Sequence, residues 1–96
     1  MNQYLITAYD FTDEQALDRR MAVRPDHLEG ARTLKSKNQF VLGGAMLNDD
    51  GKMVGSTMMV QFETPADLDE WLANEPYILR KVWDKVTVTS FRVANV

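Results

Sequence analysis

The sequence contains no cysteine, which excludes disulfide bonds and thiolate metal ligands. It has one histidine, so a transition-metal site is not expected either. No apolar run approaches the roughly 18 residues that span a bilayer, and the first residues lack the features of a signal peptide. No glycine-rich loop has the spacing of a phosphate-binding motif. We therefore expect a complete cytoplasmic protein that binds no metal, cofactor or membrane.

Positive charge is also scarce. The chain has 11 basic and 14 acidic residues, a net charge of −3 and an isoelectric point near 5.0. The basic residues are scattered, and this disfavours nucleic acid as a partner. A chain of 96 residues, 45% hydrophobic and 26% charged, has the size and composition of a single globular domain, which we place at residues 1–96.

Four segments are expected to be β-strands because they are rich in β-branched, aromatic and other apolar residues. They are residues 3–9, 39–47, 52–62 and 85–93. The Asp50-Gly51 pair between the second and third segments is a turn signal, so these two should form an antiparallel hairpin.

Two helical regions separate these strands. Pro25 should divide the first region into a short helix or turn at residues 13–23 and a helix from Pro25 to about Lys37, because proline is unfavourable inside a helix. In the second region Thr64 and Pro65 have the residue types of a cap and a first helical position. The buried stripe of that helix is Leu68, Trp71 and Leu72, and residues 77–83 should form another short turn.

The order β-α-β-β-α-β predicts an α+β, ferredoxin-like fold, in which both helices cover one face of a four-stranded antiparallel sheet. Neighbouring strand residues that point to opposite faces are both apolar in Tyr4-Leu5-Ile6 and in Phe40-Val41-Leu42. The uncovered face should therefore carry an apolar patch, and we expect a homodimer whose sheets pack face to face. The alternative is that edge strands and loops of the same chain cover the patch.

His27 is the main candidate for chemistry. If Pro25 begins a helix, the ring lies near the positive helix end, which favours the neutral form that a general base needs. His27, Ala31 and Leu34 lie at positions i, i+4 and i+7, so the ring should face the sheet. The alternative is a core histidine that is bonded to a backbone carbonyl.

Arg24 and Glu75 are the charged residues that could assist His27. Arg24 precedes Pro25, where an extended backbone could send its guanidinium toward the same cavity to hold a carboxylate, or it could pair on the surface with Asp18 or Asp26. Glu75 lies at a break between two helical pieces, where it could orient the imidazole or simply cap a helix.

Glycines interrupt two of the expected strands, where they weaken pairing unless a bulge or a close approach needs them. If Gly43-Gly44 and Gly55-Ser56 face each other across the hairpin, they leave room for a ligand beside Gly44, and Ser56 can supply a hydrogen bond. Alternatively, the glycines let a helix pack closely on the sheet.

Several segments together resemble the YciI-related family. They are RRMAVRPDHL at 19–28, LGGAM at 42–46, the Gly55-Ser56 pair, NEPY at 74–77 and KVTVTSFRV at 85–93. The resemblance covers nearly the whole chain. It implies a ferredoxin-like domain that dimerises as an α/β barrel, with a pocket in which a histidine and an aspartate are proposed as a catalytic pair.

The family pattern can be carried over by position. The histidine is then His27, the basic partner Arg24 and the acid Glu75. This chain has Glu75-Pro76 where the family usually has Asp-Pro, and the extra methylene keeps the charge but moves it by about 1.5 Å. The resemblance also implies a substrate such as a small cyclic acid, a lactone or a halogenated ring compound.

Three functions follow from these observations. The first is a cofactor-free acid–base enzyme, of lyase, isomerase or hydrolytic type, that acts on a small, anionic cyclic metabolite through His27 and Glu75, with Arg24, Ser56 and Gly44 at the substrate. The second is a small-molecule binding module without catalysis. The third, RNA recognition on the sheet, is disfavoured because residues 52–62 lack the aromatic and basic side chains that stack and hold bases.

Overall fold

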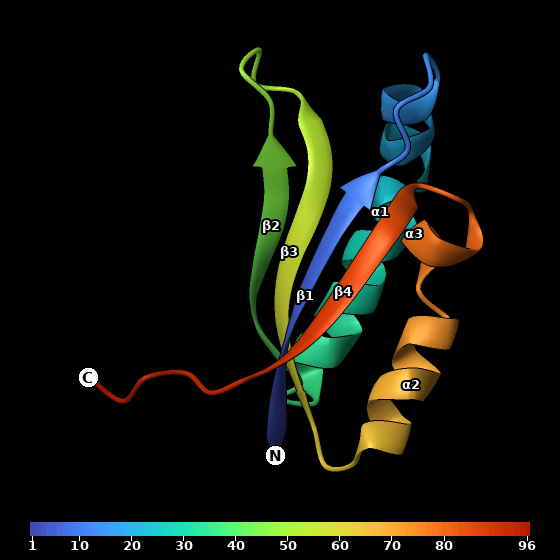
Figure 1. The fold of residues 1–96 in the computed structure, drawn as a ribbon. Helices are drawn as coiled ribbons and strands as arrows, with labels where there is room; N and C mark the ends of the chain where they lie inside the picture. The colour runs from blue at the N-terminus through green and yellow to red at the C-terminus, as the bar shows by residue number, and fades with distance from the viewer.

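Four antiparallel strands form one sheet, and the helices lie together on one of its faces (Figure 1). The computed structural model describes residues 1–96. Its elements are β1 (Asn2–Asp10), α1 (Ala16–Ser36), β2 (Phe40–Leu47), β3 (Met53–Phe62), α2 (Pro65–Ala73), α3 (Pro76–Leu79) and β4 (Trp83–Phe91). The strand order β2-β3-β1-β4 confirms the ferredoxin-like fold. No helix has both the length and the apolar character needed to cross a membrane.

Helix α1 is continuous, and the expected break at Pro25 is wrong. A proline inside a helix removes one N–H donor and crowds the carbonyl four residues earlier, here that of Met21. Pro25 itself is exposed, while Val23, His27 and Leu34 on the opposite stripe are buried against the rest of the protein. Tertiary packing of this stripe offsets the local cost, since most helical stability in proteins comes from such packing.

The second helical region forms as its caps predict. The Thr64 hydroxyl accepts a hydrogen bond from the Asp67 backbone N–H at 3.2 Å, and Pro65 is the first helical residue of α2. Glu75 caps α3 in the same way and is followed by Pro76. The expected turn at 77–83 is shorter than predicted because Trp83 already belongs to β4.

The core lies between the sheet and the helices. Every second residue of β1 is buried in this core, because successive side chains in a strand point to opposite faces. Ile6, for example, is 1% exposed and Ala8 is 0% exposed. The other members of the core cluster are Tyr4, Val23, Leu34, Met58, Val60, Phe62, Leu68, Tyr77, Val82 and Trp83.

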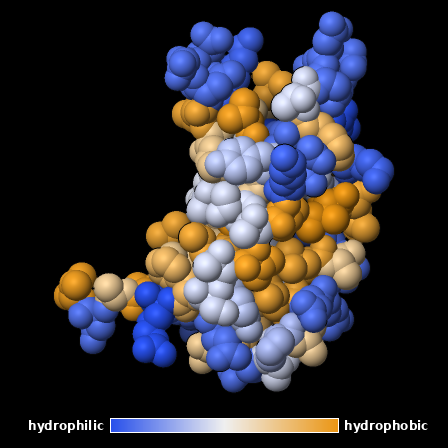
Figure 2. All heavy atoms as spheres, viewed as in Figure 1, coloured by the Kyte–Doolittle hydropathy of each residue, from blue (hydrophilic) through white to orange (hydrophobic).

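The opposite face of the sheet is left uncovered by the helices, and Figure 1 views the sheet from that side. The strand register places Leu42, Met59 and Leu5 in one apolar row across β2, β3 and β1. The next row is small and polar, with Thr57 and Thr7 beside each other. Figure 2 shows the resulting mixture of apolar and near-neutral side chains over the strands. The face is therefore partly apolar, and Leu42 on it is 56% exposed.

Candidate functional site

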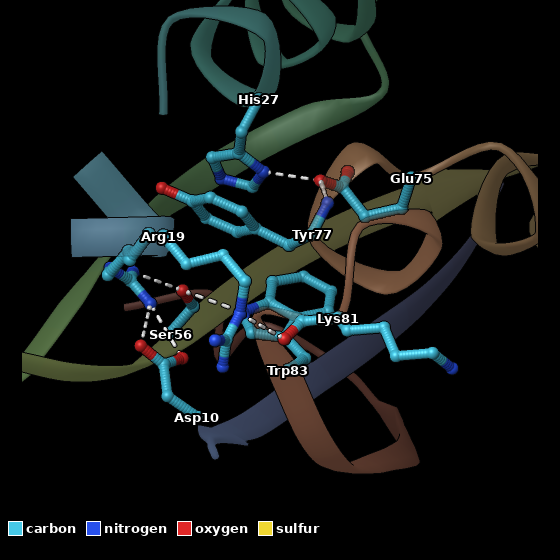
Figure 3. Close-up of polar contacts among 9 residues, drawn as sticks. Asp10, Arg19, His27, Ser56, Glu75, Tyr77, Lys81 and Trp83 are labelled. Carbon is cyan, nitrogen blue, oxygen red and sulfur yellow. Dashed lines mark hydrogen bonds and ion pairs between the residues drawn. The ribbon is translucent and has the colours of Figure 1, made fainter. Parts of the chain in front are cut away.

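His27 and Glu75 meet beneath helix α1. His27 Nδ1 lies 2.6 Å from Glu75 Oε1, and the two side chains are only 10% and 2% exposed (Figure 3). The two residues are 48 positions apart in the chain. The prediction that the ring faces the sheet is confirmed. The prediction that the ring lies beside the start of a helix is wrong, because α1 begins at Ala16 and His27 lies inside it.

Glu75 is held in place by the backbone of the turn that it caps. Its Oε1 accepts a hydrogen bond from the Tyr77 backbone N–H at 3.2 Å, in addition to its contact with His27. Both roles that the sequence suggested for Glu75, capping and contact with the imidazole, are thus present together. The glutamate side chain thus reaches both partners through one oxygen.

The carboxylate defines which ring nitrogen of His27 carries the proton. An ionised carboxylate only accepts hydrogen bonds, so Nδ1 donates to Glu75 and a neutral ring has its lone pair on Nε2. Nε2 makes no hydrogen bond inside the chain, and it is not among the fully buried unpaired atoms, of which Arg20 Nε is the only one. The basic nitrogen of the pair is therefore accessible from outside.

Two aromatic rings enclose His27. The Tyr77 ring stacks on the imidazole with 4.0 Å between ring centroids and 14° between planes, and Trp83 meets it edge-on at 5.8 Å. Burial raises the pKa of the Tyr77 phenol, an effect that the positive charges of Arg20 and Arg24 partly oppose. The phenol therefore stays protonated and remains a hydrogen-bond donor at neutral pH.

A second buried polar cluster lies two helical turns from His27. Arg20, 2% exposed, donates to both oxygens of Asp10 at 2.8 and 3.0 Å and to Ser56 Oγ at 2.6 Å. Trp83 Nε1 donates to the same serine oxygen at 3.1 Å. Desolvation raises the pKa of Asp10 even though the Arg20 charge acts in the opposite direction.

This cluster is linked to the His27 pair through Tyr77. The Arg20 guanidinium carbon lies 4.7 Å from the centroid of the Tyr77 ring, a cation–π distance. Sequence reasoning missed Arg20, Asp10 and Tyr77 as site residues. Arg20 lies seven residues before His27 and so shares its helical stripe, but this signal exists only if the helix continues through Pro25.

Arg24 lies inside α1, so the expected extended backbone at this residue is wrong. It makes no hydrogen bond or ion pair, and the expected surface partner Asp26 pairs with Arg80 instead. The guanidinium charge of Arg24 nevertheless acts on the Tyr77 hydroxyl. Arg24 is thus a free cation near the site rather than a member of a surface pair.

The expectation that the two glycine-containing pairs face each other across the hairpin is wrong. Gly44 lies opposite Thr57, on the uncovered face of the sheet, whereas Ser56 lies opposite Ala45 and faces the helices. Gly44 is therefore separated from Ser56 and from the His27 pair by the sheet. Gly55 has a packing role, because a Cβ there would lie 2.5 Å from the Ala8 carbonyl oxygen.

A groove of about 470 Å³ lies between α1 and α2. It reaches the site only at Glu75 and Pro76 and is otherwise lined by residues such as Lys37, Glu70 and Trp71. His27, Tyr77 and Arg20 do not line it. No group of three or more histidine and acidic side chains is arranged to hold a metal ion.

The YCII-related domain matches residues 2–92 of this sequence. The chain belongs to the YCII-related family. Protein YciI of Escherichia coli O6:H1 is 32% identical to this YCII-related chain over 95 residues, which cover 93% of the chain and 95% of the relative. The predicted family is therefore confirmed.

Solved structures share the fold of this YCII-related chain. The 5-chloro-2-hydroxyhydroquinone dehydrochlorinase of Burkholderia phenoliruptrix AC1100, in complex with 2,5-dihydroxybenzoquinone, has a TM-score of 0.81 at 22% identity and covers 96% of this chain and 95% of its own. A dimeric ferredoxin-like protein of unknown function from Jannaschia sp. CCS1 has a TM-score of 0.57 at 17% identity and covers 97% of this chain and 100% of its own. Both likenesses support the ferredoxin-like fold.

Proposed function

We propose that the protein is an acid–base enzyme that works without a cofactor on a small, anionic cyclic metabolite. His27 Nε2 takes a proton from the substrate, and Glu75 orients the ring and stabilises the imidazolium that forms. The observation that carries this proposal is the 2.6 Å contact between His27 Nδ1 and a carboxylate that is itself anchored to a backbone N–H.

The surroundings of the pair support this role. A general base needs a free lone pair at the site and a fixed orientation, and His27 has both, since Glu75 and the Tyr77 ring hold it while Nε2 stays accessible. The fold neighbour that dechlorinates a hydroquinone bears on the substrate class, because it acts on a small ring compound.

Arg24 and Ser56 are proposed as substrate contacts. Arg24 has no partner in the chain, so its charge is available to an anionic group close to the Tyr77 hydroxyl. Ser56 Oγ already accepts two hydrogen bonds, from Arg20 and Trp83, so it can offer the substrate only its own O–H. Gly44 is not part of the proposal because it lies on the other face of the sheet.

Turnover of small cyclic carbonyl, phenolic and lactone compounds, followed by proton NMR, tests this function. We expect His27→Ala to lower the rate on an identified substrate by about 100-fold or more, the usual contribution of a general base. Glu75→Gln should also lower the rate, because it removes the charge that stabilises the imidazolium. Glu29→Gln is its matched control, because Glu29 is an exposed carboxylate on the same helix as His27. A folded His27→Ala protein with full turnover would contradict the proposal. Thermal stabilisation by compounds that are never converted would favour a binding module instead.

We also propose that two chains pair through the uncovered faces of their sheets. The row of Leu42, Met59 and Leu5 gives this face an apolar character that isolated chains rarely expose, and the Jannaschia neighbour with the same fold is dimeric. Light scattering should give the mass of two chains for the wild type and of one chain for Leu42→Lys. A wild-type mass of one chain at micromolar concentration would contradict this assembly.

A further inference from the structure

The Tyr77 hydroxyl is a polar group for which the chain provides no partner. The residue is 1% exposed, and its ring is fixed between His27 at 4.0 Å and the guanidinium carbon of Arg20 at 4.7 Å. The hydroxyl makes no hydrogen bond inside the chain, yet it is not among the fully buried unpaired atoms, of which Arg20 Nε is the only one. The small exposed part of Tyr77 therefore includes its hydroxyl oxygen.

His27 Nε2, the ring nitrogen that does not contact Glu75, lies on the same side of the site as this hydroxyl. In Figure 3 the ring nitrogen that does not face Glu75 and the Tyr77 hydroxyl both point away from Glu75, toward the same side of the site. The rings are nearly parallel, at 14°, so the two groups are held at neighbouring positions. An acceptor and a donor thus point to the same side of the site.

Such a pair fits a particular kind of ligand. Nε2 accepts a proton, and the phenol, whose pKa is raised by burial, keeps its own proton and donates a hydrogen bond. The complementary group has an acidic hydrogen next to an oxygen acceptor. A carbonyl group with a hydrogen on the adjacent carbon has this arrangement, and the enolate derived from it keeps the oxygen acceptor.

Building on the proposed function, we propose that Tyr77 is a further catalytic residue whose hydroxyl donates a hydrogen bond to the substrate carbonyl oxygen while His27 Nε2 removes the adjacent C–H proton. The substrate is then an enolisable cyclic carbonyl compound.

The proton moves to Nε2, the C–H electron pair forms a carbon–carbon double bond, and the carbonyl π pair moves to oxygen. The product of this step is an enolate and an imidazolium. The enolate oxygen receives the Tyr77 hydrogen bond, which is stronger to an anion than to the neutral carbonyl, so the contact stabilises the developing charge.

The test uses tetronic acid, a small cyclic lactone that is an enolate anion at neutral pH, with γ-butyrolactone as the ring of the same size that lacks the enolate. We expect calorimetry to show that Tyr77→Phe binds tetronic acid about 10-fold or more weakly than the wild type, the usual effect of losing a hydrogen bond to a charged acceptor. Tyr9→Phe is the matched control, because Tyr9 is 54% exposed on β1 and faces away from the helices. It should bind as the wild type does.

A second measurement does not depend on the variant. In wild-type protein with carbon-labelled tyrosine, tetronic acid should shift the Tyr77 Cζ signal and leave those of Tyr4 and Tyr9 in place, and γ-butyrolactone should leave all three unchanged. Equal binding by Tyr77→Phe and wild type, an unshifted Tyr77 signal, or no binding to the wild type would each overturn this inference. The proposed function is judged separately, by the dependence of turnover on His27.

Discussion

The buried pair of Arg20 and Asp10 makes Asp10→Asn an informative perturbation. The two side chains are 3% and 4% exposed, and the substitution keeps the shape of Asp10 while removing its charge. Arginine cannot lose its proton in a protein, so the variant leaves an uncompensated cation inside the molecule. Breaking a buried pair in this way costs about 3–5 kcal/mol. We expect the lower end, about 3 kcal/mol, because Asp10 also borders a surface cavity through which water can approach.

The complementary variant Arg20→Met should depend on pH. Burial already raises the pKa of Asp10 from the ordinary value of 3.8. In this variant the charge of Arg20 no longer acts against that rise. A carboxyl with a raised folded pKa contributes stability below its unfolded pKa and loses that contribution as the pH rises through the folded pKa. Arg20→Met should therefore be destabilised less near pH 4 than near pH 7, by about 1 kcal/mol or more.

Urea unfolding followed by circular dichroism measures these costs, and a loss of about 3 kcal/mol should lower the melting temperature by about 12 °C or more. Asp13→Asn is the matched control, because Asp13 forms a similar two-contact pair with Arg19 on the surface. Its effect should be much smaller. An Asp10→Asn protein that loses less than about 1 kcal/mol, as an exposed pair would, would refute the reasoning that this pair is effectively buried.

Three further predictions concern the helix and the site. Pro25→Ala should stabilise the protein by about 1–2 kcal/mol in urea unfolding, because α1 regains a donor for the Met21 carbonyl, and an unchanged midpoint would contradict this. Nitrogen NMR of the only imidazole should place the proton of neutral His27 on Nδ1 and show a mixed tautomer in Glu75→Gln, so a wild-type proton on Nε2 would contradict the proposed base. Burial raises the pKa of Tyr77 above 10.0, so the unfolded state ionises first as the pH rises above this value, and the wild type should lose stability there faster than Tyr77→Phe. Parallel losses in thermal melts would contradict this.

The order of the elements and the orientation of His27 were determined by the sequence itself. Strand composition, the turn at Asp50-Gly51 and the cap at Thr64 act over a few residues, so they can be recognised without knowing the fold. The inward orientation of His27 follows from helical spacing alone. The pairing of His27 with Glu75 was predicted from the family resemblance and not from any local pattern.

Only the tertiary structure decided where the helix continues and which charged groups meet. Pro25 is unfavourable locally, and α1 passes through it because the buried stripe on the other side gains more from packing than the backbone loses. Arg20, rather than Arg24, is the buried arginine, since only the continuous helix turns it toward Asp10 and Ser56. These contacts join residues far apart in the chain, and such pairings depend on how the sheet and the helices pack, which no local pattern records.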